Sequence, residues 1–122
     1  MLEDFYTVTE KLMTEKGFDA KIVLNREHLI YKAHFPGNPI TPGVCILQIC
    51  QELVAGHCGK SLYMTNAKNI KFLNVLNPLE HKEVVFTVEY NETEAGIKAM
   101  ANIHNGEKGF AKISAEYQIE SE

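Results

Sequence analysis

Residue types that can do chemistry gather in one short segment of the sequence. His34 precedes a loop, residues 36–43, that holds three prolines and two glycines, and an imidazole titrates close to neutral pH. Gln48 and Glu52 follow at positions four apart, which lie on one face of a helix. Taken alone, His34 would be an ordinary loop histidine that caps a strand or packs against prolines. Its significance depends on the elements around it.

The loop leads into a predicted helix. Its prolines specify a stiff, irregular backbone. Thr41 is the expected N-cap and Pro42 suits the first helical position, so the helix should run from Pro42 to about Ala55 and stop at Gly56. A helix that is apolar nearly all round is buried on most sides, which favours a curved sheet wrapped around it. The apolar set is Val44, Ile46, Leu47, Ile49, Cys50, Leu53 and Val54, and the polar stripe is Gln48, Gln51 and Glu52.

The rest of the chain should supply that sheet. Alternating apolar residues predict strands over 83–90, 97–103 and 111–119, and Asn105-Gly106 is a typical hairpin turn. Another strand should begin at Ile70, before the Asn77-Pro78 turn. The result is an α+β domain of antiparallel strands around one long helix.

The N-terminal third is expected to begin with a helix. Apolar residues within 4–16 lie close to helical spacing, and Gly17 is a suitable residue to end such a helix. Residues 21–24 and 29–31, with a polar turn at 25–27 between them, then look like two strands or one long bent strand.

The segment His34-Phe35-Pro36-Gly37-Asn38-Pro39-Ile40-Thr41-Pro42-Gly43-Val44 resembles the active-site loop of bacterial (3R)-hydroxyacyl-(acyl-carrier-protein) dehydratases. The similarity covers the His-Phe-Pro-Gly start, the proline two residues later and the Pro-Gly-Val that opens the helix. Residues 68–75 resemble the strand that follows this helix in the family. The resemblance implies a hotdog fold, with residues 1–122 as a single domain.

The resemblance also implies roles for the loop residues. His34 would remove a proton from C2 of a 3-hydroxyacyl thioester, as a neutral imidazole can. The backbone N–H groups of Gly43 and Val44 would polarise the thioester carbonyl, since the first N–H groups of a helix lack partners and the helix dipole favours negative charge there. The carbonyl of Ile40 would hold the second histidine nitrogen. Such an elimination needs no cofactor and no metal.

The chain departs from the family at the second catalytic position. The family carries a carboxylate there, and this sequence has Gln48, which cannot act as a general acid. One turn later the family carries glutamine, and here Glu52 stands. Gln48 would orient the hydroxyl or a water. Glu52 could act as the acid if burial raises its pKa, or it could be a structural residue that pairs with a neighbour.

The leading hypothesis is therefore a dehydratase-like hydro-lyase of fatty-acid or polyene lipid synthesis that gives the trans-2-enoyl thioester. In the family two subunits pair, so the chain could form a homodimer or a heterodimer with a homologous dehydratase that supplies the carboxylate. It could also be a non-catalytic subunit that binds an acyl thioester. A hotdog acyl thioesterase is the other enzymatic alternative, although the loop is typical of dehydratases.

Charge and composition limit the classes of binding partner that we expect. A net charge of -4 argues against nucleic acid. Lys60, Lys68 and Lys71 could contact an acidic acyl carrier protein, and acyl-CoA is the other expected source of the thioester. No apolar run is long enough to span a membrane and no signal peptide is visible, so a cytoplasmic protein is expected. The three cysteines are expected to be small buried hydrophobic residues.

Overall fold

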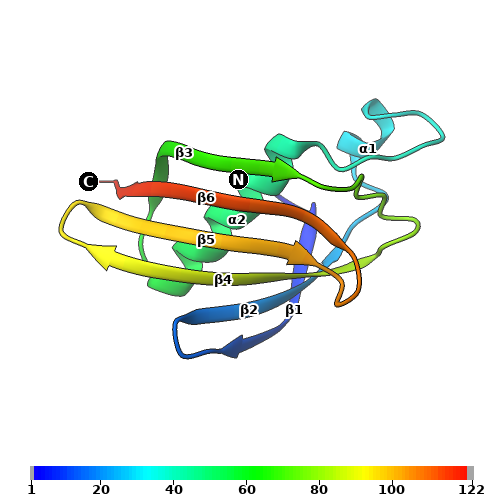
Figure 1. Ribbon diagram of the computed structural model, residues 1–122. Helices are drawn as coiled ribbons and strands as arrows, with labels where there is room; N and C mark the ends of the chain where they lie inside the picture. Colours follow the sequence, from blue (N-terminus) through cyan, green and yellow to red (C-terminus); the bar gives the residue numbers. More distant parts are fainter. Residues whose placement is uncertain (1, 121–122) are drawn as a thin grey trace.

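Six antiparallel strands form one sheet in the order β1-β2-β4-β5-β6-β3. The computed structural model describes residues 2–120. The strands are β1 (Tyr6–Met13), β2 (Gly17–Leu24), β3 (Leu62–Phe72), β4 (Glu83–Thr93), β5 (Gly96–His104) and β6 (Gly109–Ile119), and the helices are α1 (Leu29–Ala33) and α2 (Gly43–Cys58). The sheet curves around α2, and α1 projects with its loop beyond one end of the sheet (Figure 1). This arrangement confirms the predicted hotdog fold.

The core lies between α2 and one face of the sheet. Alternate side chains of β4, β5 and β6 point inward, as the period of two predicts. The turn at Asn105-Gly106 joins β5 to β6, with Gly106 at φ 96°. The buried residues of α2 are Cys45, Ile46, Ile49, Cys50, Leu53 and Val54. Val44, by contrast, is 73% exposed, so the helix is covered on one side and not all round.

The predicted helix over 4–16 is wrong, because this segment forms the edge strand β1. Val8, Leu12 and Met13 are all exposed, so their spacing did not mark a core face. Gly17 does not end a helix. A Cβ at this position would lie 1.9 Å from the Val88 carbonyl oxygen, so glycine is needed where β2 approaches β4.

The predicted strand at 29–31 is also wrong. It is the short helix α1, whose N-cap His28 accepts a hydrogen bond from the Ile30 N–H at Nδ1 over 3.1 Å. Helix α2 is longer than predicted. It passes through Gly56 and ends at Gly59, whose φ of 67° and N–H bond to the Ala55 carbonyl form a left-handed C-cap.

Two features bear on the expected partners and cysteines. Within residues 2–120, no helix combines the length and apolar character that crossing a bilayer requires. Cys45 and Cys50 are buried, as expected, and Cys58 is half-buried, all three as free thiols.

Candidate active site

His34 lies at the junction between α1 and the loop that leads to α2. It is the C-cap of α1, and its N–H donates to the Ile30 carbonyl over 3.0 Å. Its ring is exposed and meets Phe35 edge-on, with ring centroids 5.6 Å apart. The backbone around it is held, because the Ile40 N–H donates to the His34 carbonyl over 2.8 Å. The predicted bond from the imidazole to the Ile40 carbonyl is not present among the hydrogen bonds of the described residues.

Helix α2 begins one residue later than predicted, and its first turn is uncapped. Pro42 occupies the N-cap position and offers no side-chain acceptor. The N–H groups of Cys45 and Ile46 donate to the Pro42 carbonyl. Within residues 2–120, the N–H groups of Gly43 and Val44 have no hydrogen-bond partner. They are the two groups that the sequence assigned to carbonyl polarisation, and such orphan donors at a helix start suit a developing oxyanion.

A small hollow of about 360 Å³ lies beside this helix start. Its lining residues are Ile40, Thr41, Gly43, Ile46, Phe72, Leu73, Asn74, Val75 and Leu76. The ring of Phe72 packs so closely on Gly43 that a Cβ there would lie 2.6 Å from Phe72 Cζ. A side chain at position 43 would therefore force the Phe72 ring to move.

Gln48 and Glu52 form a hydrogen-bonded pair on α2. The Gln48 amide donates to Glu52 Oε2 over 3.0 Å. The same carboxylate accepts the Leu2 N–H over 2.9 Å and the Tyr6 hydroxyl over 2.8 Å. Glu52 therefore ties α2 to the N-terminal segment and to β1.

The charge state of Glu52 is the reverse of the one that an acid role requires. Partial burial raises the pKa of this carboxyl, but the three hydrogen bonds that it accepts outweigh burial and leave its pKa below the ordinary value. The net shift of the Glu52 pKa is therefore downward, opposite to the raised pKa expected for an acid. The ionised carboxylate also raises the pKa of Tyr6, where burial is the largest cause. Glu52 is an acceptor in a structural network at neutral pH.

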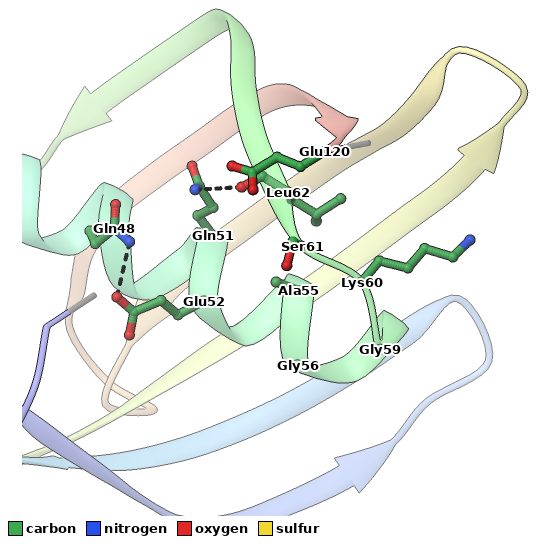
Figure 2. A pocket seen from close by; sticks show the side chains of 10 residues that line it. All are labelled: Gln48, Gln51, Glu52, Ala55, Gly56, Gly59, Lys60, Ser61, Leu62 and Glu120. Atoms are coloured by element: carbon green, nitrogen blue, oxygen red, sulfur yellow. Dashed lines mark hydrogen bonds between the residues drawn. The ribbon is translucent and has the colours of Figure 1, made fainter. Parts of the chain in front are cut away.

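The polar stripe of α2 faces a shallow groove of about 580 Å³ (Figure 2). Gln51 donates to the Leu62 carbonyl at the start of β3 over 2.9 Å, whereas the side chains of Gln48 and Glu52 are hydrogen-bonded to each other. Of the lysines predicted to contact a carrier, Lys60 pairs with Glu92 at 2.6 Å and Lys68 with Glu116 at 2.9 Å.

Sequence reasoning missed one buried contact near the site. The hydroxyls of Tyr31 and Thr41 lie 2.8 Å apart, and both side chains are almost fully buried. Tyr31 also stacks on Phe5, with centroids 5.1 Å apart. The signal was available in part, because an aromatic residue three positions before His34 faces the same side of a helical turn. It was lost when residues 29–31 were assigned to a strand.

Comparison with known proteins identifies the family. The family model described as "ApeI-like: ApeI dehydratase" matches residues 10–111. The chain belongs to the ApeI-like dehydratase family. The family also carries the dehydratase character that the loop resemblance implied, since curated relatives are 3-hydroxyacyl-[acyl-carrier-protein] dehydratases named FabZ.

Two of these FabZ relatives show how similar the sequences are. The FabZ of Ligilactobacillus salivarius is 31% identical over 104 residues, which cover 79% of this chain and 74% of the relative. The FabZ of Latilactobacillus sakei is 32% identical over 87 residues, which cover 65% of this chain. The match spans only 61% of that relative's own length.

Solved structures similar to this ApeI-like chain share its fold. The dehydratase heterocomplex ApeI:P from Xenorhabdus doucetiae superposes with a TM-score of 0.67 at 11% identity, over 92% of this chain and 96% of that one. A hypothetical thioesterase with coenzyme A from Streptococcus pneumoniae gives 0.66 at 10% identity, over 100% and 92%. At these identities the similarity shows the hotdog fold alone.

Proposed function

We propose that this chain is the histidine-bearing subunit of a 3-hydroxyacyl-thioester dehydratase, completed by a homologous subunit that supplies a carboxylate. The observation that carries the proposal is the asymmetry of the acid/base pair. His34 is present and exposed, and the helix that follows its loop starts without a side-chain cap, whereas position 48 holds an amide and Glu52 is already engaged as an ionised acceptor.

The reaction follows from these parts. The His34 imidazole takes the C2 proton, and the electron pair of the C–H bond forms the C2–C3 double bond. The hydroxyl leaves C3 as water after it receives a proton from the partner's carboxylic acid. The N–H groups of Gly43 and Val44 stabilise the negative charge on the thioester oxygen. Gln48 would orient the departing hydroxyl in the opposite site of the pair.

The exposed surface around β3 and the start of α2 is suited to contact with a partner subunit. Strand β3 forms one edge of the sheet and pairs only with β6 within the described residues, and an open strand edge is a template for pairing. Apolar side chains are exposed near the helix start, among them Val44, Phe72 and Val75 at 73%, 53% and 60%. A patch of this kind is typical of an interaction surface.

The experiment is a mixing assay with a carrier-bound 3-hydroxyacyl thioester. The chain is assayed alone, with a FabZ-type homologue whose own histidine is replaced by alanine, and with the same homologue whose carboxylate is also removed. We expect enoyl thioester from the first mixture and little from the chain alone or from the second mixture.

Each alternative gives a different result. Full enoyl production by the chain alone would contradict the need for a partner carboxylate. Release of free thiol from a saturated acyl thioester would identify a thioesterase. Thioester binding without turnover in every mixture would identify a non-catalytic binding subunit. Replacement of the carrier by coenzyme A in the same assay distinguishes the two thioester sources.

A further inference from the structure

The start of α2 differs from the start that its own sequence favours. A threonine followed by proline normally places the threonine at the N-cap, where its hydroxyl accepts a hydrogen bond from the N–H of the second or third helical residue. With Thr41 at the N-cap, those residues would be Gly43 and Val44. The helix instead begins at Gly43, and Pro42 occupies the N-cap without a side-chain bond.

The hydroxyl that would have capped the helix is engaged elsewhere. Thr41 is 4% exposed and its Oγ1 lies 2.8 Å from the Tyr31 hydroxyl. Tyr31 is itself held by the stacking of its ring on Phe5. Burial raises the pKa of Tyr31 to about 12, so this hydroxyl stays protonated at neutral pH. The Thr41 N–H donates to the Leu76 carbonyl over 2.9 Å, which fixes the backbone from the other side.

We infer that Tyr31 is a positioning residue, whose hydrogen bond withholds Thr41 from the cap and so leaves the N–H groups of Gly43 and Val44 free for the substrate carbonyl. The inference deepens the proposed function and rests on it for the identity of that ligand. Tyr31 precedes His34 by three residues, so this bond also joins the segment that carries the histidine to the segment that carries the N–H groups.

Amide hydrogen exchange measured by NMR on the full chain tests this inference without any assay of activity. In the wild-type chain the Gly43 and Val44 amides should exchange without protection. In Tyr31→Phe the released Thr41 hydroxyl should cap the helix and slow exchange at one of these amides by about fivefold. In Tyr31→Phe combined with Thr41→Val no hydroxyl is left, and exchange should return to the wild-type rate.

Controls separate this effect from general loss of order. Thr41→Ser keeps the hydroxyl and should exchange like the wild type. Tyr63→Phe removes an exposed tyrosine hydroxyl, bonded to Gln118 over 3.0 Å, and should change neither amide. Slow exchange at both amides in the wild-type chain, or unchanged exchange in Tyr31→Phe, would overturn the inference. If Tyr31→Phe does not fold, protection of both amides in the wild-type chain would still overturn the inference.

Binding of crotonyl-CoA, followed by calorimetry, links the inference to function. Tyr31→Phe should bind about fivefold more weakly, because the cap now competes with the thioester carbonyl. The double variant should recover the wild-type affinity. Slowed exchange with unchanged affinity would uphold the positioning role of Tyr31 and contradict the proposed role of the two N–H groups.

Discussion

The two ends of the candidate site on α2 are built in opposite ways. At the helix start the polar groups are unsatisfied, since two N–H groups lack partners among residues 2–120 and His34 is exposed. One and a half turns later the polar groups are satisfied by one another, since Glu52 accepts three hydrogen bonds and Gln48 donates one of them. N–H groups without a protein partner at a helix start are open to water or to a ligand. The comparison favours the helix start as the chemical part and the Gln48–Glu52 pair as the structural part.

The largest expected effect comes from removal of the histidine. His34→Ala should lower enoyl thioester formation by about 10²–10⁴-fold in the mixture with the homologous subunit. Because the side chain is exposed, the free energy of unfolding should change by no more than about 0.5 kcal/mol. Parallel rate measurements and urea unfolding curves check both statements. If His34→Ala keeps the wild-type rate, another residue must act as the base.

The second prediction exchanges the two residues of the satisfied pair. Gln48→Glu with Glu52→Gln gives the order that the loop resemblance implies for the family, and it should raise dehydration by the chain alone about 10²-fold. Gln48→Glu alone should gain less at neutral pH, because two adjacent carboxylates oppose each other's ionisation and titrate as a unit.

Glu52→Gln alone is the matched control for this exchange and should gain nothing. If the doubly exchanged chain is no faster than the wild type, a missing carboxylate at position 48 is not what limits it.

The third prediction concerns the contact between Gly43 and Phe72. Gly43→Ala places a methyl group against the Phe72 ring and should displace it across the hollow, which weakens thioester turnover by about tenfold through misplacement. Gly56→Ala is the control. No atom lies within 4 Å of a Cβ at that helical position, so it should stabilise the fold by about 0.5–1 kcal/mol. Equal turnover rates in Gly43→Ala and Gly56→Ala would show that Gly43 is not part of the site.

The smallest effect is a pH dependence of stability. The pKa of Glu52 is lower in the folded chain than in the unfolded one, so its contribution to stability is present above about pH 4.5 and is lost as pH falls through the folded value. Glu52→Gln should cost about 1 kcal/mol at pH 7, because the pair is partly solvent-exposed. The difference from the wild type should shrink toward pH 3 in unfolding curves. A constant difference would show that Glu52 does not act through its charge.

The sequence predicted the parts in which local pattern and tertiary contact agree. The strands β4, β5 and β6 alternate because one face is buried, and the loop from His34 to Val44 is specific enough to indicate the family. It failed at β1, where an edge strand with both faces largely exposed leaves no periodic signal. It also failed at α1, where a five-residue helix is too short to show a period.

The contacts that connect the candidate site to distant segments were not predicted. Gly43 and Val44 were assigned from the helix start, and the structure leaves their N–H groups free. The shift of the N-cap from Thr41 to Pro42 depends on Tyr31, ten residues away in sequence. The charge state of Glu52 depends on Tyr6 and on the Leu2 N–H. Contacts of this kind between distant segments leave no local pattern, because each partner is an ordinary residue in its own segment.

The glycines of this chain differ in whether a second substitution could relieve the clash that an alanine would cause. At Gly17 and at Gly96 an added Cβ would meet a backbone carbonyl oxygen, at 1.9 Å and 2.1 Å, and no change of side chain elsewhere can move that atom. At Gly43 the obstacle is the side chain of Phe72. A second substitution such as Phe72→Leu should therefore suppress Gly43→Ala, whereas Gly17→Ala should have no suppressor. Position 43 and position 72 are thus free to vary together, and a change at one predicts which residues the other can accept.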